Sequence, residues 1–163
     1  MEIRRARLED AAAIAEVHVR TWQAAYEHVF GAERLATFDL DARTRRWEGW
    51  LTSGENASVA VVDGRVVAFV WVGPSREAPD EGELFAIYAL PEAWGSGAGR
   101  QLMAVGLAAL RELGLAEAIL WVLADNPRAR RFYEREGWHT DGGRKREEFL
   151  DVEVEEVRYR IVL

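Results

Sequence analysis

The chain has 163 residues, of which 49% are hydrophobic and 30% charged, and it contains no cysteine. This length and composition are typical of one globular domain with a full hydrophobic core, so we expect a single domain over residues 1–163. The lack of cysteine excludes a disulfide framework, a thiolate metal site and a cysteine nucleophile. A net charge of −7 argues against nucleic-acid binding, which requires a basic surface.

No apolar run approaches the roughly 20 residues that span a bilayer. The opening residues, MEIRRARLED, lack the apolar core of a signal peptide. We therefore expect a cytoplasmic protein without membrane contact. An acidic surface is also compatible with a cationic small substrate, because its field attracts cations, although many soluble proteins are simply acidic.

The first third of the chain predicts one strand and two helices. Residues 2–6 form a short strand with polar alternation, and apolar residues at helical spacing predict a helix over residues 8–26. A second helix is expected over residues 42–53, with Asp41 as its N-cap.

The middle of the chain predicts a hairpin followed by a strand and a helix. Two β-branched runs in residues 57–73 are joined by Asp63-Gly64, a typical two-residue turn. A loop leads to a strand over residues 84–90, and the next helix ends at Leu113, with Gly114 as its C′ residue.

The last third predicts a buried strand, a helix and two final strands. Residues 116–123 are nearly continuously apolar, which is typical of a strand covered on both faces. A helix begins after Asp125-Asn126-Pro127, and strands follow at residues 138–142 and 155–163. The resulting order, β-α-α-β-β-β-α-β-α-β-β, indicates a mixed-sheet α/β or α+β domain.

The stretch WGSGAGR, residues 94–100, places three glycines between the strand and the helix. Glycine costs backbone entropy, so its repetition favours close approach of a ligand, usually a phosphate on the helix N-terminus. A nucleoside-triphosphate loop is excluded, because Arg100-Gln101 follow Gly99 in place of Lys-Ser/Thr. The dinucleotide fingerprint does not match in frame, and a ligand-free tight turn remains the structural alternative.

A second pattern supports a ligand site. Asn126 and Tyr133 are seven residues apart, about two helical turns, so both point to the same side of their helix. That helix follows the strand expected beside residues 84–90, so an amide and a phenol should face the cleft that the glycine loop closes. The alternative is a Tyr133 ring packed in the core.

The segment from Glu81 to Trp138 resembles the GNAT superfamily of acetyl-CoA-dependent N-acetyltransferases. The resemblance rests on LFAIYALPEAWGSGAGRQLM and LWVLADNPRARRFYEREGW, supported by TWQAAYEHVF and RRWEGWL near the N-terminus. It implies an α+β fold of three α/β/α layers, in which helices cover both faces of a mixed, mostly antiparallel central sheet.

The resemblance also implies how acetyl-CoA binds as co-substrate. Its pantetheine arm would pair with the backbone of Ile87, Tyr88 and Ala89, and Asn126 would touch it. The pyrophosphate would rest on the backbone amides of Gly95, Ser96, Gly97, Ala98, Gly99 and Arg100. The family position usually held by Gln or Arg is Trp94 here, so Arg100 or Arg131 is expected to replace the lost phosphate contact.

The implied reaction is direct attack of a primary amine on the thioester carbonyl. Tyr133, near the sulfur, would act as general acid and protonate the departing thiolate. The amine must first lose a proton, and Glu83 is a candidate base acting through water, unless it is only a solvated charge at a loop end.

The acceptor is expected on the other side, between the first two helices and the hairpin. Trp22, Tyr26, Trp47 and Trp50 are candidates to line its site, although core packing is the more common role for at least two of them. His18 and His28 are possible bases, but a lone histidine on an apolar helix face is more often structural. The three scattered histidines predict no metal site.

We therefore expect an N-acetyltransferase acting on the primary amine of a small molecule. Three alternatives stay open: acetylation of a protein amino group, a non-catalytic acyl-CoA sensor or scaffold, and a nicotinamide oxidoreductase. Seven tryptophans and an expected edge strand ending at Leu163 further predict a homodimer.

Overall fold

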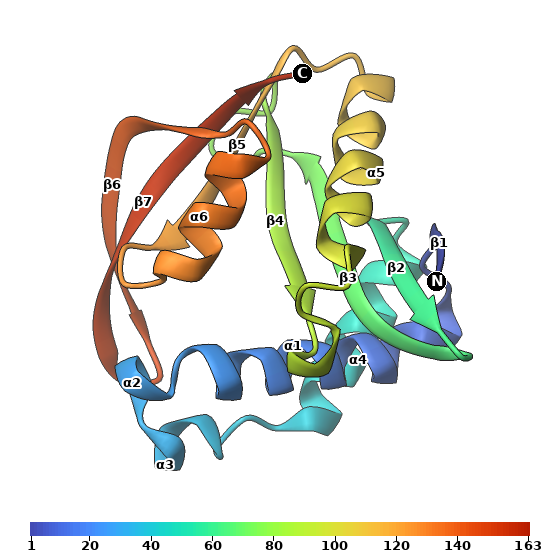
Figure 1. Ribbon diagram of the computed structural model, residues 1–163, viewed down its shortest axis with the longest axis vertical. Coiled ribbons are helices and arrows are strands. Elements are labelled where there is room, and N and C mark those ends of the chain that lie inside the picture. Colours follow the sequence, from blue (N-terminus) through green and yellow to red (C-terminus); the bar gives the residue numbers. More distant parts are fainter.

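The computed structural model describes residues 1–163 as one seven-stranded sheet with helices packed on it (Figure 1). The strands run in the order β1-β2-β3-β4-β5-β7-β6, and only the β4–β5 pair is parallel. This confirms the expected mixed, mostly antiparallel sheet. The strands are β1 (Glu2–Arg5), β2 (Asn56–Val62), β3 (Arg65–Pro74), β4 (Gly82–Ala89), β5 (Glu117–Leu123), β6 (His139–Phe149) and β7 (Val152–Val162).

Six α-helices and two short 3-10 helices connect these strands. None of the helices is both long and apolar enough to cross a membrane. The helices are η1 (Leu8–Asp10), α1 (Ala11–Ala25), α2 (Glu27–Phe30), α3 (Ala32–Leu35), α4 (Leu40–Thr52), η2 (Pro91–Ala93), α5 (Ala98–Glu112) and α6 (Pro127–Arg135).

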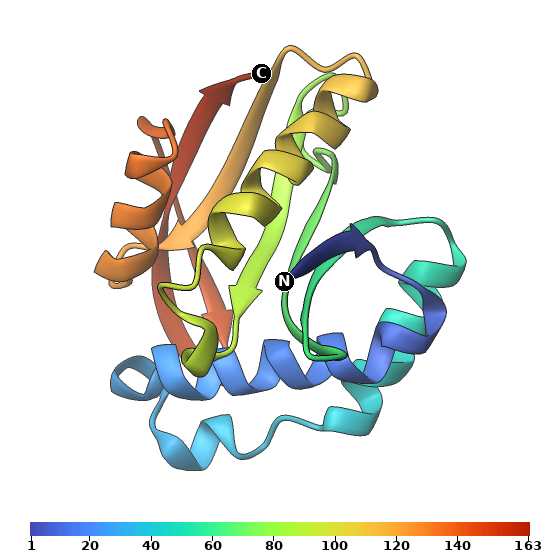
Figure 2. The ribbon, with the colours of Figure 1, turned by 45° about the vertical axis from the view of Figure 1, so that its right-hand side comes forward.

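Helices cover both faces of the sheet (Figure 2), and alternate side chains of β3 identify which helix lies on which face. Phe69 packs against Trp47 of α4, with ring centroids 5.1 Å apart. Val70 and Val72 point the other way, toward Gly106 of α5, where an added Cβ would come within 3.2 Å of both side chains. Because successive strand residues face opposite sides, α1 and α4 lie on one face and α5 on the other. The three-layer α/β/α arrangement is confirmed.

The predicted N-cap of α4 was wrong. Asp39 has an extended backbone, and its Oδ1 accepts a hydrogen bond from Ala42 N at 3.0 Å, so the helix begins at Leu40. Asp41 lies inside the first turn, where the helix dipole also favours a negative charge. Two acidic residues near one helix start are both plausible caps, and the backbone conformation decides between them.

The first helix is shorter than predicted, because Asp10 turns back toward the N-terminal strand. Its carboxylate accepts two hydrogen bonds from Arg4, at 2.7 and 2.9 Å, and one from Arg7 N at 2.7 Å. This ends the 3-10 turn at Asp10 and starts α1 at Ala11. The contact with Arg4 holds the pKa of Asp10 below its usual range despite burial.

The last two strands form a longer hairpin than predicted, and its order corrects the expected edge. β6 continues to Phe149, and β7 begins at Val152 after a tight turn in which Leu150 and Asp151 have φ angles of 51° and 62°. The strand that ends near Leu163 lies between β5 and β6, so β6 and β1 are the edges. Charged residues on both faces of this hairpin hide its alternation in the sequence.

Divergence of β4 and β5 creates the space for a site. The two strands pair only at Gly82 with Ala118 and at Glu83 with Ile119, and then separate. The edge of β4 beyond Glu83 therefore has no neighbouring strand on the β5 side.

Candidate active site

One cavity of about 890 Å³ occupies the region between the diverging strands. It runs from the start of α5, past β4, to residues of α1, α4 and the β6–β7 hairpin. We call the part near the start of α5 the loop end and the part lined by α1, α4, β6 and β7 the acceptor end.

The loop end presents free backbone amides. Gly95 and Gly97 have φ angles of 78° and 88°, a region that disfavours side chains, and Gly97 is the N-cap of α5. The N–H groups of Gly95, Gly97, Gly99 and Arg100 donate to no acceptor in the chain, whereas Ala98 N donates to Ser96 Oγ at 3.3 Å. Unpaired amides at a helix N-terminus form an anion-binding site. The Ser96 and Ala98 side chains do not line the cavity.

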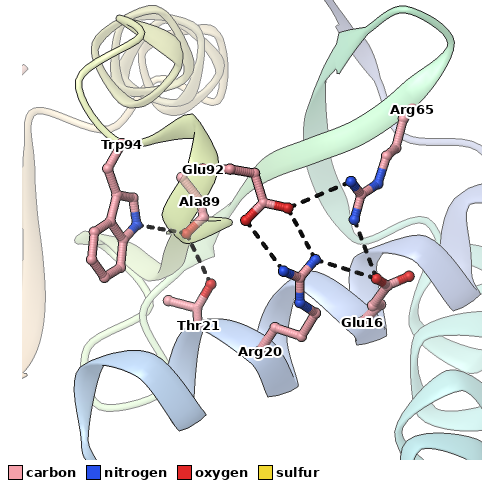
Figure 3. A network of polar contacts seen from close by, with 7 residues as sticks. All are labelled: Glu16, Arg20, Thr21, Arg65, Ala89, Glu92 and Trp94. Atoms are coloured by element: carbon pink, nitrogen blue, oxygen red, sulfur yellow. Dashed lines mark hydrogen bonds and ion pairs between the residues drawn. The ribbon is translucent and has the colours of Figure 1, made fainter.

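Trp94 holds the loop against the end of β4 (Figure 3). Its indole N–H donates to Ala89 O at 2.8 Å, and Thr21 Oγ1 of α1 donates to the same oxygen at 3.0 Å. The guanidinium of Arg128 lies 3.4 Å from the centre of the Trp94 ring and lines the cavity. Arg131 is exposed and does not line the cavity, so Arg128 and Arg100 are the cations near the loop.

An ion-pair network connects η2 to the rest of the fold (Figure 3). Arg20 of α1 donates to both carboxylate oxygens of Glu92, at 3.1 and 3.2 Å, and Arg65 of β3 lies 3.5 Å from Glu92. Glu16 forms an ion pair with each of these two arginines. These exposed pairs each contribute little stability, but together they link η2, which directly precedes the loop, to α1 and β3.

The backbone of β4 offers hydrogen bonds toward the cavity at alternate residues. Leu90 N donates to Val67 O of β3 at 2.9 Å. Because antiparallel strands alternate their bonding, the backbone groups of Tyr88 also face β3, whereas those of Ile87 and Ala89 face the gap. The Ala89 oxygen is already taken by Trp94 and Thr21. The Ile87 N–H, Ile87 C=O and Ala89 N–H remain for a ligand, and Tyr88 contributes its side chain to the cavity.

Asn126 and Tyr133 both line the cavity. Asn126 Oδ1 caps α6 by accepting from Ala129 N at 3.1 Å, and its Nδ2 donates to the Tyr26 hydroxyl at 2.9 Å. Tyr133 is 7% exposed, and its hydroxyl forms no hydrogen bond within the chain. Burial, reinforced by Tyr88 and Tyr26, raises the pKa of Tyr133 well above its usual value. Its hydroxyl is therefore protonated at neutral pH and free to donate.

Carboxylates line the acceptor end. Glu83 is half-buried and accepts from Ser75 Oγ at 3.0 Å, and burial raises its pKa. Glu156 of β7 is only 7% exposed, and burial raises its pKa to about 7, with Lys145 opposing the shift. The Lys145 Nζ lies 3.9 Å from Glu156.

Sequence reasoning missed Glu156. The alternation of Val157, Tyr159 and Ile161 places Glu156 on the opposite face of the last strand. A charged residue on that face is expected to be exposed to solvent. Only the fold shows that this face closes the cavity.

The predicted acceptor residues have different positions. Trp22, Tyr26 and Trp50 line the cavity, whereas Trp47 is fully buried in the core. His18 also lines the cavity, and burial lowers its pKa to about 3, so it is neutral at pH 7.

The other histidine that sequence analysis singled out lies outside the cavity. His28 is exposed, and its Nε2 lies 3.1 Å from the Asp125 carbonyl oxygen.

Comparison with known proteins identifies the family. The model of the Acetyltransferase (GNAT) family matches residues 12–138. The chain is 34% identical over 128 residues to the "Uncharacterized N-acetyltransferase YuaI" of Bacillus subtilis (strain 168), covering 77% of this chain and 73% of that protein. It is 37% identical over 122 residues to a mycothiol acetyltransferase of Cellulomonas flavigena, covering 70% of this chain but only 34% of that protein.

Solved structures share the fold. The PaiA N-acetyltransferase of Thermoplasma acidophilum, in complex with coenzyme A, superposes with a TM-score of 0.78 at 17% identity, over 99% of this chain and 98% of that chain. Together with the family match, this shows that the chain belongs to the GNAT family of acetyltransferases and is an acyltransferase.

Proposed function

We propose that the protein transfers the acetyl group of acetyl-CoA to the primary amine of a small molecule. The observation that carries this proposal is the set of unpaired amides at the start of α5, which adjoins an open β-strand edge and a protonated, unpartnered Tyr133 hydroxyl. These three features provide an anion site, an extended binding edge and a proton donor within one cavity.

The residues present fit acetyl-CoA. Its pyrophosphate would accept from the amides of Gly95, Gly97, Gly99 and Arg100, with Arg128 supplying positive charge. The free groups of Ile87 and Ala89 match the amides of a pantetheine arm, as an added strand would. The Thermoplasma relative of the same fold was solved with coenzyme A.

Tyr133 serves as the general acid in this proposal. Attack by the acceptor nitrogen on the thioester carbonyl forms a C–N bond and breaks the C–S bond, so the sulfur leaves with the electron pair. The Tyr133 hydroxyl then gives its proton to that sulfur, and the proton that the nitrogen loses after it attacks returns the tyrosinate to the phenol. Its raised pKa keeps the proton available, and general acid catalysis is typically worth ~10²–10⁴-fold.

Glu156 is the better candidate for the base. An amine with a pKa of about 10 is protonated at pH 7 and must lose a proton before it attacks. A carboxylate with a pKa of about 7 is partly ionised there and accepts protons efficiently. Glu83 contributes by raising the pKa of Glu156, and it is the second candidate.

Thiol release tests this function directly. Purified protein with acetyl-CoA and a panel of primary amines should release free thiol in an amine-dependent manner, and the N-acetylated product should appear by mass spectrometry. Release only with protein amino termini would favour the protein acceptor. Tight acetyl-CoA binding without release by any amine would favour a sensor or scaffold and contradict the proposal.

Homodimerisation stays a prediction, but its structural basis changes. Because β7 is internal, the strand edges available for pairing with a second copy belong to β6 and β1. Light scattering at tens of micromolar, in order of magnitude, should report a dimer, and a monomer there would contradict it.

A further inference from the structure

Arg43 of α4 lies at the acceptor end without a counter-ion. Its side chain lines the cavity and is half-buried. No carboxylate in the chain comes within ion-pair distance of Arg43, and its guanidinium donates no hydrogen bond. Most other arginines that point into the fold, such as Arg4 and Arg160, pair with carboxylates.

The groups that face Arg43 do not neutralise it. On α4 itself, Arg46 also lines the cavity and adds positive charge. On α1, His18 is neutral at pH 7. The Phe38 ring, 5.8 Å from the Arg43 guanidinium carbon, orients this group through a cation–π contact.

Tyr88 of β4 also lines the cavity and is influenced by charges of both signs. Burial raises the pKa of Tyr88, Glu156 adds to that rise, and Arg43 opposes it. Both charges therefore act on the same hydroxyl of β4. The cavity carries Arg43 and Arg46 on α4, and it carries carboxylates on β4, β6 and β7 together with Lys145 of β6. Aromatic side chains also line it.

A half-buried guanidinium without a counter-ion loses hydration, and no hydrogen bond within the chain replaces it. An anion bound beside Arg43 would compensate for the lost hydration. A carboxylate suits this position in particular, because its two oxygens can accept parallel hydrogen bonds from the planar guanidinium group. The remaining walls, with Trp22, Trp50, Phe38 and Phe149, suit an apolar body.

We propose that the acceptor is a zwitterionic amino acid-type molecule with an apolar side chain, whose carboxylate pairs with Arg43. The acidic wall attracts its amine, and Arg43 orients the molecule so that the amine faces the open edge of β4. This inference rests on the proposed acetyltransferase function, and it specifies the class of acceptor.

Matched acceptors and variants test it. Leucine is compared with 3-methylbutylamine, and phenylalanine with 2-phenylethylamine, since each pair differs only by the carboxylate. Wild-type protein should prefer the amino acid by about a hundredfold in kcat/KM, as expected for a partly buried charge pair. Arg43→Gln should remove that preference, with little change for the decarboxylated amines. Arg45→Gln, an exposed neighbour outside the cavity lining, should retain it.

Several outcomes would overturn the proposal. The first is a wild-type enzyme with equal kcat/KM for the amino acid and its decarboxylated amine. The second is an Arg43→Gln variant whose kcat/KM falls equally for both members of a pair. The third is a loss of acetyl-CoA affinity in Arg43→Gln, which would indicate that Arg43 binds a phosphate.

A binding experiment separates this inference from the proposed function. N-acetylleucine and N-acetyl-3-methylbutylamine are titrated calorimetrically into protein saturated with coenzyme A. Arg43-dependent binding of N-acetylleucine supports the inference even if turnover is absent. Binding of neither compound, or equal binding of both, contradicts it while leaving thiol release with other amines to decide the proposed function.

Discussion

The two ends of the cavity are built in different ways. The loop end is formed by consecutive residues, 94–100, and presents mainly backbone amides. The acceptor end is assembled from α1, α4, β4, β6 and β7, and it presents aromatic and charged side chains that are far apart in the sequence.

This difference separates two kinds of recognition. Backbone amides bind phosphate whatever the neighbouring side chains are, so the loop end depends on conformation and on small residues. The acceptor end depends on which side chains meet, so its specificity can change through single substitutions. Substitutions at the loop end should therefore alter acetyl-CoA binding, and those at the acceptor end should alter turnover and acceptor choice.

The largest effect is expected at the loop. Changing Gly97 and Gly99 together to Val should weaken acetyl-CoA binding by about a thousandfold, because two or three hydrogen bonds to a charged group are lost, each worth ~1.5–3 kcal/mol. Calorimetry measures the affinity. Gly114→Val is the matched control, since Gly114 also has a positive φ of 78° but lies outside the cavity lining. Equal affinity in a folded double variant would contradict the amide site.

Tyr133→Phe should lower kcat by about a hundredfold, the low end for general acid catalysis, because a thiol with a pKa near 8.5 is already a fair leaving group. Acetyl-CoA affinity should be nearly unchanged. The melting temperature should hold, because the hydroxyl has no partner in the chain.

Tyr159→Phe is the contrasting control for this experiment. The Tyr159 hydroxyl donates to Glu134 at 2.8 Å and accepts from Arg130 at 3.1 Å. Its loss should cost about 1 kcal/mol of stability without changing kcat per folded molecule. A Tyr133→Phe variant that lost stability and kept wild-type kcat would assign Tyr133 a structural role only.

Glu156→Gln should lower kcat/KM by about tenfold above pH 7, less than a full general-base contribution, because Glu83 remains nearby. In wild-type protein, activity should rise with pH through about 7 as Glu156 ionises, and the variant should lack this inflection. Glu153→Gln, exposed on the same strand, should behave as wild type. An unchanged inflection in Glu156→Gln would exclude Glu156 as its source.

The raised pKa of Glu156 also predicts that the stability of the folded protein changes with pH. The folded pKa of this residue is raised from the unfolded value of 4.5 to about 7, so the unfolded chain releases this proton first. The corresponding stabilisation is complete below about pH 4.5 and is lost as pH rises through 7. Between pH 4.5 and 7, the melting temperature of Glu156→Gln should therefore rise relative to that of the wild-type protein. A constant difference between the two melting temperatures across this pH range would contradict the shifted pKa.

The smallest effect is expected from Trp94. Trp94→Phe removes the hydrogen bond to Ala89 O and weakens the stacking of Arg128, so acetyl-CoA affinity should fall about fivefold, equivalent to ~1 kcal/mol. Arg128→Gln should give a similar loss, and the double variant should lose less than the sum of the two, because the residues act as a pair. Fully additive losses would show that Trp94 does not position Arg128.

Features set by a few neighbouring residues were predictable from the sequence. Asp63-Gly64 forms the hairpin turn, Asn126 caps α6 ahead of Pro127, and Gly114 follows α5 with a positive φ. Each reflects a local backbone preference that acts in any tertiary context. The glycine loop belongs to this group, so residues 94–100 alone were enough to indicate the free backbone amides at the start of α5, where we propose that acetyl-CoA binds.

Other features depended on contacts between distant residues. The backbone path determines that Asp39, and not Asp41, caps α4. Asp10 lies outside α1 because its carboxylate binds Arg4. The β6–β7 hairpin looked irregular because its charges pair across strands, as in Arg146 with Glu153. Such pairs have no periodic signature in the sequence.

Sequence alone thus predicted the order of the seven strands and of α1, α4, α5 and α6, the glycine loop before α5 and the shared side of Asn126 and Tyr133, because these depend on short-range conformational preferences and helical spacing. It did not predict the short helices α2 and α3. Only the tertiary structure decided that Glu156 is buried, that Trp47 belongs to the core while Trp50 lines the cavity, and that Arg43 has no counter-ion. The groups packed around a charged side chain determine its pKa and whether it has a counter-ion. Those groups come from widely separated parts of the chain.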